Sequence, residues 1–463
     1  MTFGHMPLQL GGLAPVVSLV IGVAAIVFLL IVLDLPPFVA LVLSGFAVGT
    51  VTPAIPFPEV PGEYAGAFGD GMAGIGIPIL MAAVIGKAMI ESGAADRIVR
   101  GFTALFGQER TEFSLFGSSF VIAIPVFFDN VFYLLAPLAR AARSRTGADY
   151  TLFIVAVGAA GAVTHGFVPP TPGPLLAANE LDANIGTTIV IGVLTAAPTA
   201  IIAGLGYGYW INRRLNIPLR DAMGTTVEEV QEKVDTPTSA LPGLFESLLP
   251  ILLAVLLVAS NTFVETFVGE DSAAAAFTGY VGDPNFALTI AALSAAYTFY
   301  RVSEFGDEEF SDELTDALKS GGNIAAITAA GGAFGAMLAE AGVGEYIAGG
   351  LENVGLGLLV TAWVIAAGVR VVQGSATVAI VTTAGIMAPF TGELTVNAAY
   401  LVMVIGAGAT FCSWYNDSGF WIVKEIGGLT QAETLKTWTV ATILIGIVGL
   451  LSTLVLSTVL PLA

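Results

Sequence analysis

Apolar segments long enough to cross a membrane recur along the chain, separated by short polar stretches. A helix needs about 20 mainly apolar residues to span the hydrocarbon layer of a bilayer. Clear runs occupy residues 13–33, 38–51, 187–210, 244–260, 286–300 and 439–460, and other apolar runs are interrupted. The pattern predicts an all-α, polytopic membrane protein.

The apolar segment 113–139 contains polar residues near its middle, where a simple membrane anchor would have none. Arginines flank it on both sides, so the positive-inside rule places both flanks in the cytoplasm. These are Arg97, Arg100, Arg110, Arg140, Arg143 and Arg145. A re-entrant hairpin with limbs of about 13 residues, or roughly 20 Å, keeps both flanks on one side. Pro125 interrupts the helix, and Asp129 and Asn130 would then lie near the turn, lining a cavity.

A broken helix is predicted over 151–180, because "HGFVPPTPGP" (165–174) places four prolines in an apolar context. The same order of features returns later in the chain. "GKAMIESG" (86–93) aligns with "GAMLAEAG" (335–342), and after it come a hairpin over 346–390 and a broken helix over 397–425. An odd number of crossings separates the two copies, so we expect an inverted repeat, which is typical of secondary transporters.

These features suggest six divisions of the chain. They are N-terminal scaffold spans (1–72), a first repeat (73–211), a cytoplasmic linker (212–240), two linking spans (241–301), an acidic cytoplasmic loop (302–316) and a second repeat (317–463). The N-terminus lacks a basic region and a small-residue cleavage site, so we expect no cleaved signal peptide. The single cysteine, Cys412, cannot form an intramolecular disulfide.

The chain is strongly acidic, with 36 acidic residues, 16 basic residues and a formal net charge of −20. The acids are spread over several polar segments, which favours a solvated surface of the halophilic type over a cation-attracting vestibule. The sign of the charge argues against nucleic-acid binding. The sequence has no metal-ligand spacing, nucleotide loop or catalytic triad, so we expect neither an enzyme nor a bound cofactor.

Four polar segments at membrane depth are candidate functional sites, and each has a structural alternative. An intramembrane carboxylate costs about 2.5–3.5 kcal/mol on insertion scales, so Asp129 and Asp417 are expected to hold a proton or Na⁺. Helix capping is the structural alternative, and it is compatible with that function. His165 either exchanges a proton or bonds a carbonyl group freed by the prolines. "QGSATVA" (373–379) either binds substrate through hydroxyl, amide and helix N-terminal groups or packs helices closely.

Two basic residues in apolar segments are assigned structural roles. Arg370 flanks the second hairpin and is expected to snorkel to the membrane interface rather than to pair with a substrate carboxylate. Lys87 and Glu91 lie four residues apart on one helix face, which predicts a salt bridge.

Five motifs in order, "IPVFFDN", "HGFVPPTPGPL", "QGSATVAIVTTAG", "NDSGFW" and "LKTWTV", resemble the gluconate permease (gluconate:proton symporter) family of the ion-transporter superfamily. The resemblance covers nearly the whole chain. It implies a multi-pass inner-membrane symporter, usually proton-coupled, for gluconate or related acids such as glycerate or D-serine. It also implies a homodimer and elevator-type movement. The family pattern often has histidine where this chain has Thr171, and glutamate where it has Asp129.

The resemblance places substrate contacts on fifteen positions of this chain. They are Asp129, Asn130, His165, Thr171, Pro172, Gly173, Gln373, Gly374, Ser375, Ala376, Thr377, Asn416, Asp417, Ser418 and Gly419. Asp129, Asp417 and His165 are also the candidates for ion coupling. Na⁺ coupling remains an alternative to proton coupling, and a passive channel or facilitator is the alternative from another functional class.

Overall fold

The computed structural model describes residues 14–33, 35–220, 237–269, 272–303, 306–343, 357–414 and 417–462. Within these ranges the protein is helical and has no β-strand. Six helical stretches there are long and apolar enough to cross a membrane. They are Phe57–Glu91, Tyr150–Glu180, Ile185–Asn212, Leu244–Glu265, Glu308–Glu340 and Gln431–Val459. The predicted all-α, multi-pass architecture is confirmed.

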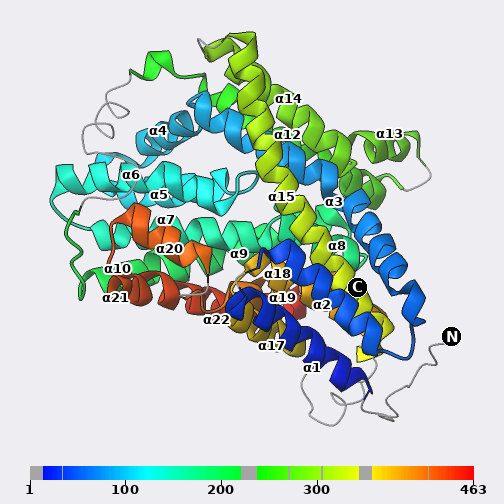
Figure 1. Ribbon diagram of the computed structural model, residues 1–463. Coiled ribbons are helices and arrows are strands. Elements are labelled where there is room, and N and C mark those ends of the chain that lie inside the picture. Colours follow the sequence, from blue (N-terminus) through cyan, green and yellow to red (C-terminus); the bar gives the residue numbers. More distant parts are fainter. Residues whose placement is uncertain are drawn as a thin grey trace.

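Two long helices, α3 (Val60–Glu91) and α15 (Asp307–Glu340), run side by side through the molecule (Figure 1). Small residues permit this contact, since a Cβ on Gly321 of α15 would lie only 2.8 Å from the Ala83 Cβ of α3. Lys87 of α3 pairs with Glu91 at 2.9 Å, as predicted, and also with Glu313 of α15 at 2.5 Å. The ion pair between Lys87 and Glu313 and the close packing of small residues therefore join the two helices.

Within the described residues, the helices that follow α3 and those that follow α15 share several features. α3 and α15 are both followed by a left-handed glycine, Gly93 or Gly342, each with φ of 72°, and these two glycines end the aligned sequence segments. In the first half come α4 (Ala94–Phe106), α5 (Thr111–Ile122), α6 (Phe128–Thr146), α7 (Tyr150–Phe167), α8 (Pro172–Glu180), α9 (Ile185–Ala200) and α10 (Tyr207–Asn212). In the second half come α17 (Leu358–Gln373), α18 (Ala376–Met387), α19 (Ala398–Thr410), α20 (Ser418–Gly427), α21 (Gln431–Thr434) and α22 (Val440–Val459).

The remaining helices surround these two sets. α1 (Ala14–Val27) and α2 (Pro37–Val51) pack together, and α2 also packs on α15. Three helices connect the halves: α12 (Leu244–Phe267), α13 (Ala273–Val281) and α14 (Pro284–Val302). α12 packs on α4, and α14 packs on α3. The most deeply buried helices are α7 and α19, which lie at the centre of the packing.

The structure corrects three predicted boundaries. The expected acidic loop 302–316 is wrong, because α15 begins at Asp307. Phe310 fixes this first turn by packing on Phe299 and Tyr300, with ring centroids 5.2 Å apart in each case. The division at 72/73 falls inside α3, and the division at 316/317 falls inside α15. The first part of the expected hairpin 346–390 lies outside the described residues.

Candidate functional site

A cavity of about 210 Å³ lies where the turns of both halves meet. Of the predicted substrate residues, ten line it: Asp129, His165, Pro172, Gly173, Ser375, Ala376, Thr377, Asp417, Ser418 and Gly419. Asn130, Thr171 and Gly374 are not among its lining residues. Asn416 and the side chain of Gln373 are outside what the structure describes.

Four helix N-termini converge on this cavity. The first residues of α6, α8, α18 and α20 all belong to its lining, represented by Phe128, Pro172, Ala376 and Ser418. A helix N-terminus carries a partial positive charge and presents backbone N–H groups that have no intrahelical acceptor. Their convergence makes the cavity suited to an anion.

The first turn joins α5 to α6 through residues 123–127, which include Pro125. Asp129 lies in the first turn of α6 but does not cap it. Its side chain is exposed to the cavity and has no hydrogen bond or ion pair with any described residue. The capping alternative for Asp129 therefore fails, and its carboxylate is available to a ligand.

The first broken helix separates α7 from α8 over residues 168–171. Thr171 is 2% exposed, and its hydroxyl donates to the Val168 carbonyl oxygen at 2.7 Å. This bond gives Thr171 a structural role in the break. His165 lies one turn before it, with its ring edge-on to Phe127 and its Nδ1 buried without a hydrogen-bond partner in the described chain.

The second turn joins α17 to α18 at Gly374, whose φ of 91° requires glycine. Ser375 follows as the N-cap of α18, with its hydroxyl accepting from the Val378 N–H at 3.3 Å. Thr377 is half-buried and lines the cavity. The turn thus presents one hydroxyl that caps a helix and a second that borders the cavity.

The second broken helix separates α19 from α20 and ends at Asp417, which is 8% exposed. Asp417 caps α20, since its Oδ1 accepts from the Gly419 N–H at 3.1 Å. Its Oδ2 accepts from the Arg370 Nη2 at 2.5 Å and from the Ser413 hydroxyl. The capping alternative for Asp417 is confirmed, together with a buried ion pair that the sequence did not indicate.

Arg370 corrects the interface prediction. It is 4% exposed and lines the cavity, so it does not snorkel to the membrane surface. A guanidinium can be buried there because Asp417 compensates its charge. One sequence signal could have predicted this ion pair. Arg370 and Asp417 both lie in interrupted helices at membrane depth, where a charged side chain needs a partner.

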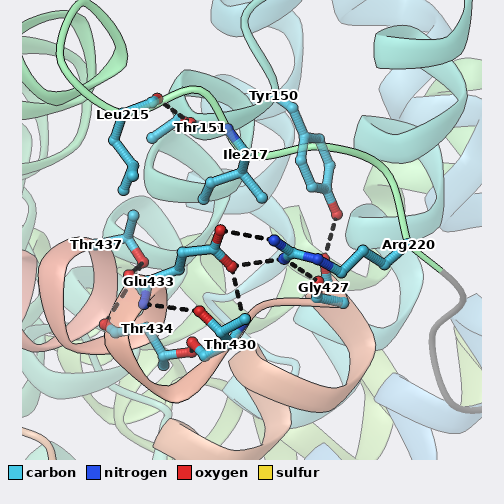
Figure 2. Close-up of polar contacts among 11 residues, drawn as sticks. Tyr150, Thr151, Leu215, Ile217, Arg220, Gly427, Thr430, Glu433, Thr434 and Thr437 are labelled. Atoms are coloured by element: carbon cyan, nitrogen blue, oxygen red, sulfur yellow. Dashed lines mark hydrogen bonds and ion pairs between the residues drawn. The ribbon is translucent and has the colours of Figure 1, made fainter.

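A polar contact outside the cavity holds the far end of α20 (Figure 2). Arg220 donates to both carboxylate oxygens of Glu433, at 2.6 and 2.9 Å, and to the Gly428 carbonyl oxygen at 3.2 Å. The Tyr150 hydroxyl donates to the Gly427 carbonyl oxygen at 2.7 Å. These bonds fix the C-terminal end of α20 against α7 and the segment after α10, and so fix the helix whose N-terminus lines the cavity.

The chain matches the model of the GntP family permease over residues 14–459. It is 36% identical over 427 residues to the gluconate permease of Pseudomonas aeruginosa, covering 92% of this chain and 93% of that protein. It is 32% identical to the Gnt-II system L-idonate transporter of Escherichia coli, covering 96% of this chain and all of that protein.

Among solved structures, the YdaH transporter of Alcanivorax borkumensis superposes with a TM-score of 0.57 at 13% identity, covering 86% of this chain and 88% of that one. At that identity the likeness concerns the fold alone. The family match and the permease relatives confirm the sequence resemblance, and they identify a transport protein rather than an enzyme. The chain belongs to the GntP family of permeases.

Proposed function

We propose that this protein is a secondary active transporter that carries gluconate, or a related small hydroxylated carboxylate, across the cytoplasmic membrane. The observation that carries the proposal is the convergence of four helix N-termini on one cavity. That arrangement favours an anion and leaves hydroxyl groups at the rim for a polyhydroxy chain. Relatives named gluconate permease and L-idonate transporter support the same substrate class.

In this proposal the substrate lies between the two turns and the two breaks. The backbone N–H groups at the N-termini of α6, α18 and α20 face its negative end, and Ser375 and Thr377 hydrogen-bond its hydroxyl groups. The family resemblance further implies substrate contacts with Gln373 and Asn416. Gly173 of α8 lines the cavity, but the space that a Cβ on it would occupy is filled by Ile380, whose Cδ1 would lie 2.6 Å away.

The coupling cation, a proton or Na⁺, binds at Asp129. This carboxylate borders the cavity and has no partner among the described residues, whereas Asp417 already holds Arg370. Neutralising Asp129 lowers the cost of moving a loaded, negatively charged site through the membrane. His165 and Asp417 are the alternative coupling groups.

The features that the helices after α3 share with those after α15 support an inverted repeat in which α5–α6 and α17–α18 are re-entrant hairpins. α1, α2 and the linking spans 241–301 then form a scaffold, and the cavity-lining helices move against it. The homodimer and the elevator-type movement that the family resemblance implies complete this proposal. Substrate and cation would cross together as the cavity changes sides.

The test is uptake of radiolabelled gluconate into proteoliposomes at high salt, with a pH gradient or a Na⁺ gradient imposed separately and the membrane potential clamped. Accumulation above the external concentration under one gradient alone establishes symport and names the ion. Loss of that accumulation when an ionophore collapses the gradient is the control.

A passive facilitator is the competing function, since broken helices can also line a pore. It would equilibrate gluconate without accumulation under either gradient. That result, obtained with protein shown to be folded, would overturn the proposal of coupled transport.

A further inference from the structure

The Arg370 guanidinium is almost fully buried, yet only one of its three nitrogen atoms has an acceptor among the described residues. Nη2 donates to Asp417 Oδ2 at 2.5 Å, while Nε and Nη1 are buried and have no hydrogen-bond partner in the described ranges. A guanidinium carries five N–H bonds in a rigid planar fork, and buried charged donors are normally satisfied. The unused donors point to an acceptor that the described residues do not supply.

The position of Arg370 indicates what that acceptor is. The residue lines the cavity on which four helix N-termini converge, and it is the only arginine or lysine among the described lining residues. A carboxylate has two oxygen atoms whose spacing matches the guanidinium fork, so it can accept two N–H bonds at once. Water is the competing acceptor, but it does not match the fork and brings no charge.

Asp417 is itself held by hydrogen bonds, so it fixes the orientation of the Arg370 guanidinium. Its Oδ1 is held by the Gly419 N–H at 3.1 Å and its Oδ2 by the Ser413 hydroxyl as well as by Arg370. Ser413 is itself fixed by Trp438 Nε1, which donates to its Oγ at 2.5 Å. This chain of bonds holds the guanidinium at the cavity wall.

We propose that Arg370 binds the carboxylate of the transported anion through one edge of its guanidinium, formed by Nε or Nη1 together with the second N–H of Nη2, and that Asp417 is the positioning counter-ion of this guanidinium. The inference rests on the proposed function and deepens it, because it makes the carboxylate group the required feature of the substrate. A neutral polyol of the same shape is then a poor ligand. With the substrate bound, the site holds three negative charges, from Asp129, Asp417 and the substrate, and one positive charge, from Arg370. The excess of negative charge favours binding of the coupling cation at Asp129.

The test compares two ligands in two proteins by equilibrium binding to the purified full-length chain. The ligands are gluconate and gluconamide, which share the polyol chain and differ in the carboxylate. Removing Arg370 alone would leave Asp417 buried without its partner, so the variant is Arg370→Gln combined with Asp417→Asn, a neutral pair of similar size. Size-exclusion profile and thermal unfolding check that the variant folds.

The wild type should prefer gluconate over gluconamide by roughly tenfold or more in Kd, and the double variant should lose most of this preference, with the helix N-termini retaining a smaller part of it. Arg370→Lys, which keeps the charge and loses the fork, should give an intermediate ratio. A folded double variant that keeps the wild-type preference overturns the inference, and so does a wild type that binds both ligands equally.

A wild type that binds no gluconate refutes the proposed substrate instead. The same comparison then uses glycerate with glyceramide and D-serine with D-serinamide. A carboxylate preference that depends on Arg370 in either pair supports the inference, and its absence in both overturns it.

Discussion

Gly166 of α7 and Gly406 of α19 bring the two broken helices into backbone contact beside the cavity. A Cβ added to Gly406 would lie 2.3 Å from the Gly166 carbonyl oxygen, and one added to Gly166 would lie 2.7 Å from the Thr410 Oγ1. No side chain can be accommodated between the helices at Gly406, because the obstructing atom belongs to the backbone. This crossing therefore sets the distance between the two breaks that border the cavity.

Gly406→Ala should destabilise the protein, because α7 and α19 must separate to admit the methyl group. Overpacking of this kind costs about 1–3 kcal/mol, so the midpoint of thermal unfolding in detergent should fall clearly. Gly368→Ala is the matched control, since it adds the same methyl group to a helix where no atom lies within 4 Å. Equal unfolding midpoints for the two variants would contradict the tight crossing.

The bidentate pair of Arg220 and Glu433 gives a second prediction. Arg220→Ala should lower the free energy of unfolding by about 1 kcal/mol, because the pair is partly exposed. Glu433→Ala should cost more, since Glu433 also completes the capping box with Thr430 at the start of α21. Thermal unfolding measures both, and Lys319→Ala, which removes an ion pair far more exposed to solvent, is the control.

The pH dependence of the ion pair between Arg220 and Glu433 follows from the direction in which the pKa of Arg220 is shifted. The hydrogen bond to Glu433 raises the pKa of Arg220 above its usual range. A raised folded-state pKa contributes stability that is complete at lower pH and is lost only as pH rises through that value. The contribution of Arg220 should therefore stay constant across neutral pH. An Arg220-dependent loss of stability between pH 6 and 9 would count against this assignment.

Local sequence signals predicted the turns and breaks, whereas the pairing at the site needed the folded structure. The cluster of four prolines in 165–174 marks an interrupted helix, and the break over 168–171 falls there. Single prolines are a weaker signal, since Pro78 and Pro137 lie inside continuous helices. The partnership of Arg370 with Asp417 joins residues far apart in the sequence on different helices, so no spacing rule reveals it.

The prediction of an acidic loop over 302–316 was wrong for a different reason. Its charges suggested an exposed loop, but a chain can be both charged and helical when one side of the helix is apolar. Phe310 and Leu314 lie four residues apart and pack on the core, while Asp316 and Lys319 remain exposed. The density of charge thus correctly predicted that the charged side chains are exposed, but it wrongly predicted that the segment is a loop.

Recognition of substrate hydroxyl groups can be tested at Thr377. Thr377→Val keeps the shape of the side chain and removes its hydroxyl, so gluconate binding should weaken by about 1 kcal/mol, or roughly fivefold in Kd. Glycerate, which has fewer hydroxyl groups, should be affected less. Thr315→Val on the exposed face of α15 is the control. An unchanged Kd for gluconate in the Thr377 variant would remove this residue from the proposed contacts.

The sharpest prediction concerns Asp129, the carboxylate that borders the cavity without a partner among the described residues. Asp129→Asn removes the charge and keeps the size, so the variant should reach the membrane and fold normally. Gradient-driven accumulation of gluconate should fall at least tenfold, because the coupling cation loses its ligand, whereas exchange of internal for external gluconate should survive. Both activities are measured in the same proteoliposomes. Asp316→Asn, an exposed carboxylate far from the cavity lining, should leave both unchanged. Wild-type accumulation by the Asp129 variant would move the coupling role to His165 or Asp417, and loss of accumulation and exchange together would instead make Asp129 a substrate ligand.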